Sequence, residues 1–535
     1  MRRWNGWSEV GTTPLVPEDA LALLAARIGS GLPRPDAAFE DVVAAVPESR
    51  LAGETGLSTE AADRVRHARG QSLPDWIALR SGRIARVPDA VARPATDDDV
   101  RAVFAIAQRA DAAIIPYGGG TSVVGGVTPA PDDPRPVMTL STEALGGLLD
   151  LDDQSGLATF GAGTLGPDLE AALAPHGLTL GHFPQSWERS TVGGWVAARS
   201  AGQQSTGFGR IEDLFAGGRL VSPAGILDML PFPASAAGPD LRQLVLGSEG
   251  RFGVVTRATL RSVPRPPREA FPAWILPDWP RALEAARAIG RAVLPLSMAR
   301  LSTPAETESL LALSTRRGSV RALRAWLRVR GIGPEPALLI VAASGPEKLV
   351  EMAVREVGSI VRANGGTGVG GSLGRQWLRS RYRTPDLRDA LWDAGYATDT
   401  LETATDWARV GDLLAAVEKA LATGLESDGE RVHVFSHLSH LYPSGSSLYV
   451  TYVFRLADDP DATLDRWRRL KTAASEAIVA GGGTISHQHG VGRDHAPYLL
   501  AEKGPLGVAV LEDVARRFDP DRRLNPGILL EADRS

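Results

Sequence analysis

The 535-residue sequence contains no cysteine, and this absence removes several kinds of chemistry. Without a thiol the chain cannot form a disulfide, a redox-active cysteine pair, a cysteine-ligated zinc or iron–sulfur site, or a cysteine nucleophile. Lysine is also scarce, since the 58 basic residues include only four lysines. This bias is typical of a GC-rich bacterial genome. Chemistry in this protein must therefore come from oxygen atoms, imidazoles or a bound cofactor.

Two further features are missing, an excess of positive charge and a long apolar run. The formal net charge of -5 argues against a nucleic-acid binder, which would carry a basic domain or stripe. No stretch approaches the roughly 18 apolar residues of a membrane-spanning helix. Arg2 and Arg3 are not followed by the apolar core of a signal peptide. We therefore expect a cytoplasmic globular protein of two to four domains.

Patterns of apolar residues predict an α+β fold. Residues 1–86 are predicted to form helical segments broken by proline and glycine. Thr96 can then cap a helix whose apolar residues recur at i, i+3, i+4 and i+7 from Val100, and a short apolar strand follows at 112–115. Further strands are predicted at 137–140, 148–151 and 157–160.

The proline-rich segment 263–268 marks the end of this pattern, because proline cannot continue the interior of a strand. We therefore divide the chain into four parts. They are an N-terminal helical region (1–86), a first domain (87–268), a second α+β domain (269–480), and a C-terminal segment that returns to the first domain (481–535).

Three glycine-rich segments carry the first functional signal. The loop 116–122 directly follows a predicted strand and contains three consecutive glycines before Thr121 and Ser122. Glycines let backbone N–H groups converge on a diphosphate, and the two hydroxyls add donors. Similar clusters surround Gly193 and Gly250. None matches GxGxxG or a P-loop, so a glycine-rich turn without a ligand is the alternative for any one of them.

Taken together, these segments resemble the flavin-binding domain of the vanillyl-alcohol oxidase and p-cresol methylhydroxylase (PCMH) superfamily. Within it the chain is most similar to the alkyldihydroxyacetonephosphate synthase group. The resemblance extends from Arg3–Trp7 near the N-terminus to Phe518–Pro520 and Leu524–Gly527. It implies a two-subdomain PCMH-type FAD-binding domain at 87–268 and an α+β cap domain that binds substrate.

The resemblance also implies FAD as the cofactor. Relatives that attach FAD covalently use histidine or cysteine, but here no histidine lies between His67 and His176, so we expect non-covalent FAD. The residues expected to hold it come from the three glycine-rich segments. They are Pro116, Tyr117, Gly118, Gly119, Gly120, Thr121, Ser122, Gln185, Ser186, Ser190, Thr191, Gly194, Ala198, Arg199, Ser200, Ala201, Glu249, Gly250, Gly253, Val254 and Val255.

Six of the nine histidines lie between residues 433 and 495. His487 and His489, spaced i, i+2 on a segment that we expect to be extended, are predicted to point the same way. A metal site is one interpretation, but no companion carboxylate motif such as HExxH is present, so we predict no metal. The resemblance implies catalytic roles for both histidines beside the flavin. The family's middle histidine is here Gln488, which cannot titrate.

Four further site residues follow from the resemblance. Tyr449 matches the family's proton-donating and proton-accepting tyrosine, although core packing is the alternative for a tyrosine in a strand. A working phenol would need a neighbouring imidazole or cation to lower its pKa. His182 matches a catalytic histidine near the flavin. Arg300 and Arg388 match arginines for activity and substrate binding, and a guanidinium group suits a phosphate or carboxylate.

The segment Arg316–Arg330 carries six arginines and no acid, interleaved with Val320, Leu323, Trp326 and Leu327. A basic amphipathic helix of this kind can dock onto an anionic membrane surface. The alternative is a cap-domain helix that packs its apolar stripe inward.

The function predicted by the resemblance is exchange of the acyl group of acyl-dihydroxyacetone phosphate for a fatty alcohol through a flavin N5 adduct, in ether-lipid synthesis. One alternative is a FAD-dependent oxidoreductase of a 2-hydroxy acid or glycerol phosphate, which Gln488 favours. A flavoprotein that only binds is another. The expected partner is a small-molecule or lipid-phosphate substrate, with no nucleic acid. A homodimer and a peripheral membrane contact are left open.

Overall fold

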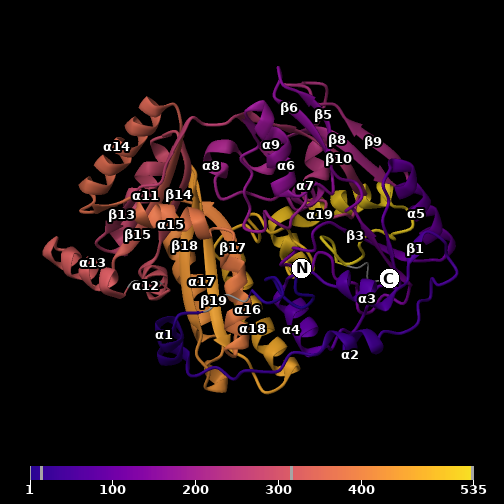
Figure 1. Cartoon of the computed structure of the whole chain (residues 1–535), viewed down its shortest axis with the longest axis horizontal. Coiled ribbons are helices and arrows are strands. Elements are labelled where there is room, and N and C mark those ends of the chain that lie inside the picture. The colour runs from indigo at the N-terminus through magenta and orange to yellow at the C-terminus, as the bar shows by residue number, and fades with distance from the viewer. Residues whose placement is uncertain (1, 13–15, 314–316, 532–535) are drawn as a thin grey trace.

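The computed structural model describes residues 2–12, 16–313 and 317–531. Figure 1 shows two β-rich bodies beside each other, with the N-terminal helices along one edge of both. The N-terminal region contains four short helices joined by loops. Its elements are α1 (Glu18–Ile28), α2 (Phe39–Ala44), β1 (Leu57–Ser58), α3 (Ala61–Arg66) and α4 (Leu73–Ser81).

The first body contains two sheets. The smaller one has the order β1-β2-β4-β3, with β2 (Ala90–Ala92), β4 (Val137–Ser141) and β3 (Ala113–Tyr117) paired in parallel. Helix α5 (Asp97–Arg109) begins where the sequence predicts, because the Thr96 hydroxyl accepts a hydrogen bond from the Asp99 amide in a capping box. The buried residues of α5 include Val100, Val103, Phe104 and Ala107, so its periodicity is confirmed.

The larger sheet of this body is antiparallel, in the order β5-β6-β10-β8-β9. Its strands are β5 (Leu148–Asp152), β6 (Leu157–Gly161), β10 (Val254–Arg261), β8 (Phe215–Ser222) and β9 (Gly225–Met229). Short helices lie between its strands in the chain, namely α6 (Gly166–Leu173), α7 (Val192–Ala198), α8 (Ser205–Phe208), α9 (Ile211–Leu214) and α10 (Arg242–Val245). The predicted proline exit forms a two-residue pair of β11 (Val263–Pro264) with β7 (Leu178–Thr179), so the proline lies outside any strand interior.

The second body is one antiparallel sheet with the path β16-β13-β15-β14-β18-β19-β17, and β12 pairs with β15 off this path. Its strands are β12 (Arg268–Ala270), β13 (Ala273–Leu276), β14 (Leu296–Ser302), β15 (Ala337–Gly345), β16 (Thr367–Gly370), β17 (Tyr396–Asp406), β18 (His433–Leu441) and β19 (Gly445–Arg455). One face packs against the helices α11 (Trp279–Arg291), α14 (Glu347–Ala363), α17 (Val410–Thr423) and α18 (Pro460–Ala480). Other helices of this region are α12 (Pro304–Ala312), α13 (Arg317–Val329), α15 (Ser372–Ser380) and α16 (Leu387–Asp393).

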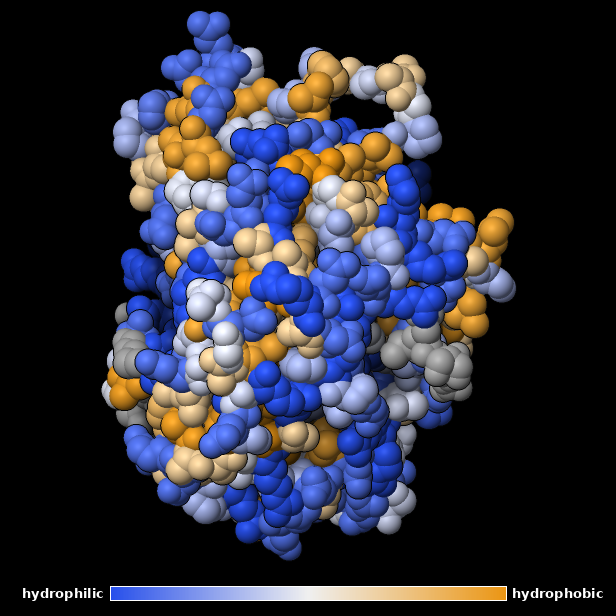
Figure 2. All heavy atoms as spheres, turned by 90° about the vertical axis from the view of Figure 1, so that its right-hand side faces the viewer, coloured by the Kyte–Doolittle hydropathy of each residue, from blue (hydrophilic) through white to orange (hydrophobic). Residues whose placement is uncertain are grey.

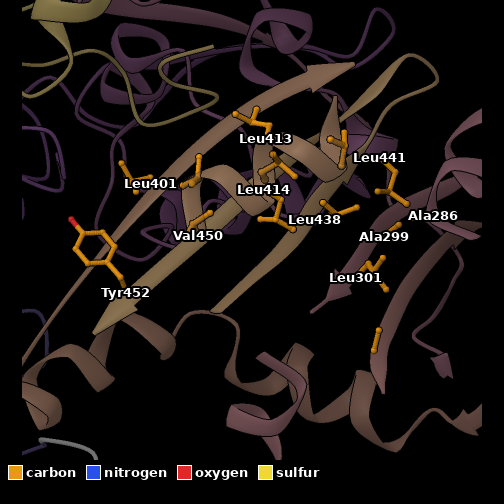
Figure 3. Packing of buried hydrophobic residues seen from close by; sticks show 14 of the residues in the cluster. Ala286, Ala299, Leu301, Leu401, Leu413, Leu414, Leu438, Leu441, Val450 and Tyr452 are labelled. Atoms are coloured by element: carbon orange, nitrogen blue, oxygen red, sulfur yellow. The ribbon is translucent and has the colours of Figure 1, made fainter. Parts of the chain in front are cut away.

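Alternation along β18 and β19 decides which side chains face the other way. Leu438 and Val450 lie in the apolar cluster with Leu413 and Leu414 of α17 (Figure 3). Successive residues of a strand point to opposite faces, so the neighbours of these leucine and valine residues face away from α17. The face away from α17 carries the functional side chains described below.

Helix α13 packs its apolar stripe inward. Leu327 is 4% exposed, and Leu323 and Trp326 pack against the same cluster as Phe271 and Ile340. The cap-helix alternative therefore describes this stripe, while Arg321, Arg324 and Arg328 are exposed on the opposite side. Arg316 lies outside the described residues.

The two chain ends tie the bodies together. Helix α19 (Leu499–Phe518) and residues 529–530 contribute to the core of the larger sheet of the first body. At the other end, the buried carboxylate of Asp389 in α16 accepts hydrogen bonds from the amides of Trp7 and Ser8 and from Arg80. Figure 2 shows one outer face, on which hydrophilic residues are interspersed with small apolar groups. No helix of the described ranges has the length and apolar character needed to cross a bilayer.

Candidate active site

One large cavity lies between the two bodies and has a volume of about 1240 Å³. Ordinary ligand pockets measure roughly 300–1,000 Å³, so this one has room for a dinucleotide together with a substrate. Its wall is drawn from the glycine-rich loops of the first body and from β14, β17, β18 and β19 of the second. Of the residues predicted to bind the cofactor, all except Arg199 line it.

The first two glycine-rich loops touch each other at this wall. A Cβ atom on Gly119 would collide with the carbonyl oxygen of Arg189, and one on Gly118 would collide with the Thr191 hydroxyl. In the described part of the chain, the amides of Gly119, Gly120 and Thr121 donate no hydrogen bond within the protein. Free amides beside a surface without side chains are the arrangement that binds a diphosphate.

The third loop is fixed by the C-terminal segment. The buried Glu249 carboxylate accepts hydrogen bonds from the amides of Val491 and Gly492 at 2.6 and 2.7 Å. Burial raises the pKa of Glu249 to about 7, although these two hydrogen bonds oppose the shift. The Asn525 amide spans two of the loops, since it donates to the carbonyls of Gly126 and Glu249.

A row of cross-strand neighbours, which we call the central row, lies on the opposite side of the cavity and contributes two of its members to the wall. Register places Ser302 of β14 beside His437 of β18, His437 beside Tyr449 of β19, and Tyr449 beside Glu402 of β17. Tyr449 and His437 both line the cavity. Their rings stack with centroids 4.9 Å apart and planes 17° apart. The row gathers four elements of distant sequence into one polar surface.

Tyr449 has the neighbours that the resemblance implies, but not the expected acidity. The His489 ring meets it edge-on, with centroids 5.8 Å apart, and the Tyr449 hydroxyl donates to Gln185 at 3.4 Å. Burial raises the pKa of Tyr449 well above its ordinary value. Burial outweighs the Thr400 hydrogen bond and the Arg300 charge, which would lower this pKa, so the neighbouring imidazole does not bring the phenol towards neutrality. The phenol is therefore protonated and available as an acid.

His487 and His489 do not face the same way. His489 and Gln488 line the cavity, whereas His487 is absent from its wall. The Nδ1 atom of His487 lies 3.1 Å from Glu402, and its Nε2 atom lies 2.7 Å from the Tyr442 hydroxyl. The i, i+2 prediction fails because residues 487–489 form a bend rather than a strand.

Glu402 organises this buried network. Its carboxylate accepts hydrogen bonds from Ser439 and Gln488 as well as from His487. Burial alone would raise the pKa of Glu402, but His487 outweighs it and lowers this pKa far below the ordinary value. Glu402 is therefore a carboxylate that fixes Gln488 and His487 in place.

Within the described ranges, Glu402, His440 and His487 form the one group whose spacing would suit a metal ion. These potential ligands already have partners. The Nδ1 of His440 lies 3.1 Å from the Ser439 hydroxyl, and its Nε2 lies 3.0 Å from the Gly202 carbonyl. The arrangement is that of a hydrogen-bonded network.

The two predicted arginines differ in how they are paired. Arg300 donates to the buried carboxylate of Glu306 at 2.8 Å, so its charge is balanced within the wall. Arg388 donates to the Gln71 carbonyl and lies over the Trp76 ring at 4.5 Å. Its Nε and Nη2 atoms are buried without a hydrogen-bond partner, and the ion pair of Nη2 with Oδ1 of Asp399 is long, at 4.0 Å. Arg388 is therefore the better placed of the two to bind a substrate anion.

His182 and Arg199 lie behind the wall. His182 is 1% exposed, and its Nε2 lies 2.8 Å from the hydroxyl of Ser200, which lines the cavity. Burial lowers the pKa of His182 to about 3, so it is neutral. Arg199 pairs with Glu212 at 3.0 Å. These positions suit support of the second glycine-rich loop rather than contact with a ligand.

Among the wall residues that the sequence does not predict are Trp7, Glu306 and His437. Trp7 belongs to the N-terminal segment, where no chemistry was expected. His437 was counted among the clustered histidines without a role, and only its alternation with Leu438 in a strand would have placed it opposite the core.

Two family models match the chain. The model of a FAD binding domain matches residues 88–229, and the model of the C-terminal domain of FAD linked oxidases matches residues 265–529. Alkyldihydroxyacetonephosphate synthase of Trypanosoma brucei brucei is 31% identical over 89% of this chain and 78% of its own length. The chain belongs to the alkyldihydroxyacetonephosphate synthase family of FAD-dependent enzymes.

Two further comparisons agree with this family. An uncharacterized FAD-linked oxidoreductase of Escherichia coli K12 is 25% identical over 90% of this chain and 95% of its own. A solved alkyldihydroxyacetonephosphate synthase has the same fold, with a TM-score of 0.82, 24% identity and 98% coverage of both chains. The predicted combination of a PCMH-type FAD-binding domain and an α+β cap domain is confirmed.

As a member of this family the protein is an enzyme, and its cofactor is FAD. The cavity fits this cofactor. The contact of Gly118 and Gly119 with the second loop leaves free amides for the diphosphate, and the cavity extends from them to the central row. When bound, the isoalloxazine supplies an electron sink within reach of a substrate held by the protein.

The glycine contact predicts the effect of one added methyl group. Gly119→Ala should weaken FAD binding by about tenfold or more, because overpacking costs roughly 1–3 kcal/mol and about 1.4 kcal/mol corresponds to a factor of ten. The measurement is the Kd from quenching of FAD fluorescence by the apoprotein. Gly146→Ala is the matched control, since its Cβ would meet only the Glu143 carbonyl, at 3.6 Å. Equal affinity of both variants would contradict this role of the loop.

Proposed function

We propose that this protein is an alkyldihydroxyacetonephosphate synthase, which exchanges the acyl group of acyl-dihydroxyacetone phosphate for a fatty alcohol in ether-lipid synthesis. One observation carries the proposal. A single cavity joins the FAD loops to Arg388, Tyr449 and His489, and continues into an apolar part lined by Leu24, Leu310, Phe435 and Val453. Arg388 suits an anionic group, Tyr449 and His489 suit a reacting carbon, and the apolar part suits an alkyl chain.

The roles of the protein groups follow from their surroundings. Arg388 binds the phosphate, because two buried donor atoms of its guanidinium lack a hydrogen-bond partner and the ion pair of Nη2 with Asp399 is long, at 4.0 Å. Arg300 holds the carboxylate of Glu306 in the wall through its hydrogen bond, and it does not bind the phosphate by itself. Tyr449 gives and takes the proton at the substrate C1 carbon, and His489 holds the ring edge of Tyr449. The FAD is bound non-covalently.

A second candidate is an oxidoreductase of a 2-hydroxy acid or glycerol phosphate, favoured by the similarity to a FAD-linked oxidoreductase and by the glutamine at position 488. The two functions differ in electron balance. The synthase exchanges groups without a net redox change, whereas the oxidoreductase reduces its flavin.

An anaerobic assay separates the two functions. The purified yellow protein should form an alkyl ether from acyl-dihydroxyacetone phosphate and a fatty alcohol, with no electron acceptor present. Its flavin absorbance should not bleach with 2-hydroxy acids or glycerol phosphate. Bleaching by one of these compounds without ether formation would contradict the synthase and support the oxidoreductase. Flavin released into the supernatant on denaturation would support non-covalent attachment.

We also propose that α13 contacts an anionic membrane electrostatically. Its apolar stripe packs inward, so the contact uses the exposed Arg321, Arg324 and Arg328 and not insertion of the helix. Basic residues near an anionic surface contribute about 1 kcal/mol each. The homodimer and the cytoplasmic location stay predictions from the sequence.

We expect that reversing these three charges weakens vesicle binding. The variant with Arg321, Arg324 and Arg328 changed to Glu should bind phosphatidylglycerol vesicles about tenfold or more weakly in a co-sedimentation assay. The control changes Lys348, Arg355 and Arg362 of α14 to Glu, which alters the net charge equally at other exposed positions. Unchanged vesicle binding by the α13 variant, or an equal loss of binding in both variants, would refute the contact.

A further inference from the structure

His437 holds a position at the site that the family resemblance does not assign. It lines the cavity, stacks on Tyr449, and is its direct cross-strand partner. It is also 5% exposed, so it belongs to the wall and not to an outer surface.

A carboxylate orients this imidazole. The Nδ1 of His437 lies 2.9 Å from Oε1 of Glu306, which also accepts from Arg300 at 2.8 Å. Burial alone would raise the pKa of Glu306, but Arg300 and then His437 outweigh it and lower this pKa to about 2. Because the ionised carboxylate can only accept, Nδ1 must carry the hydrogen. The other nitrogen, Nε2, is thereby left as a base.

The Nε2 atom of His437 is free for a ligand. No group among residues 2–12, 16–313 and 317–531 forms a hydrogen bond with this nitrogen. It is also not among the polar atoms of these residues that are fully buried without a hydrogen-bond partner. Since the residue lines the cavity, this lone pair is accessible from the cavity. A histidine held by a carboxylate on one nitrogen, with the other nitrogen free, is the arrangement that enzymes use for proton transfer.

The groups around His437 keep it neutral near pH 7. Burial lowers its pKa, Arg300 of β14 lowers it further, and Glu306 of α12 and the more distant Glu402 of β17 oppose the shift. Tyr449 of β19 faces the ring without a charge.

The other imidazoles near Tyr449 are less suited to accept a proton. His487 has partners on both ring nitrogens and lies outside the cavity wall. Gln488 cannot titrate. His489 lines the cavity, but within the described residues no carboxylate accepts a hydrogen bond from its ring, so its tautomer is not fixed as that of His437 is. His437 is therefore the imidazole that combines access with a fixed tautomer.

From His437 the wall continues along β18 and β19 to positions that include the apolar Phe435 and Val453. The next cross-strand pair along β18 and β19 is Phe435 with Thr451, and the one after it is His433 with Val453. All four line the cavity. Pairs two residues apart are about 6.6–6.8 Å apart along a strand. An alcohol oxygen at His437 would thus place its alkyl chain over Phe435 and Val453.

We propose that His437, oriented by Glu306, is the base that accepts the hydroxyl proton of the fatty alcohol. The inference rests on the proposed function. In that exchange the bond from C1 to the acyl oxygen breaks, and the fatty acid leaves as a carboxylate with the bonding electron pair. The alcohol oxygen forms the new bond to C1, and its proton passes to Nε2 of His437 and then to solvent. The balance requires no oxidant or reductant.

The test separates the step that needs this base from the step that does not. Exchange of labelled fatty acid into acyl-dihydroxyacetone phosphate uses an incoming carboxylate, which has no proton to lose. FAD-loaded His437→Gln should therefore lose about 100-fold in ether formation, within the range for general bases, while fatty-acid exchange stays within about threefold of the unchanged protein. Ether formation by the unchanged protein tests the proposed function in the same assay. If the unchanged protein forms no ether, the synthase function is refuted. If it forms ether, but the ratio of ether formation to fatty-acid exchange is the same in His437→Gln, the role of His437 as the base is refuted.

A second variant guards against a merely structural effect. Glu306→Gln keeps His437 and the side-chain volume but removes the carboxylate that stabilises the imidazolium. The acid limb of the pH profile for ether formation should then move to lower pH, and the rate should fall while FAD content and fatty-acid exchange are kept. Parallel loss of both reactions in the two variants, or an unmoved acid limb with full ether formation, would overturn the proposal.

Discussion

The structure of the site depends on the two-sidedness of the strands β14, β18, β19 and β17. One face is covered by α17 and its neighbours, where Leu438 and Val450 are buried (Figure 3). A shift of one residue in register would place these apolar side chains in the cavity and the central row in the core. Burial of the apolar face thus fixes the positions of His437 and Tyr449 opposite the FAD loops.

Carboxylates then set the chemistry of the row. Glu402 holds Gln488 and His487 on one side of Tyr449, and Glu306 holds Arg300 and His437 on the other. Both carboxylates are buried and both have lowered pKa values, because positive or hydrogen-donating partners outweigh the cost of burial. The neutral Tyr449 therefore lies between two histidines, His487 and His437, that are each held by a buried carboxylate.

The sequence predicts the flavin side of this site better than the substrate side. Loops such as 116–122 carry their function in local composition, since adjacent glycines and hydroxyls come from one short segment. The helix at Asp97–Arg109 and the strand of Tyr449 likewise follow from local periodicity. The pairing of Glu306 with His437 spans 131 residues, and no local pattern indicates it. The different surroundings of His487 and His489 likewise depend on a bend at 487–489 and on the hydrogen bond of His487 to the distant Glu402.

In the proposed function Arg388 holds the substrate phosphate in the cavity that contains the flavin. Titration of the FAD-loaded protein with an alkyl-dihydroxyacetone phosphate, followed by flavin absorbance, measures this binding. We expect a saturable spectral change whose Kd rises about tenfold or more in Arg388→Gln, because a charge-assisted hydrogen bond contributes roughly 1.5–3 kcal/mol. The exposed Arg383 lies outside the cavity wall, so Arg383→Gln should leave the Kd unchanged. No spectral change, or equal Kd values in the two variants, would show that Arg388 does not hold the phosphate.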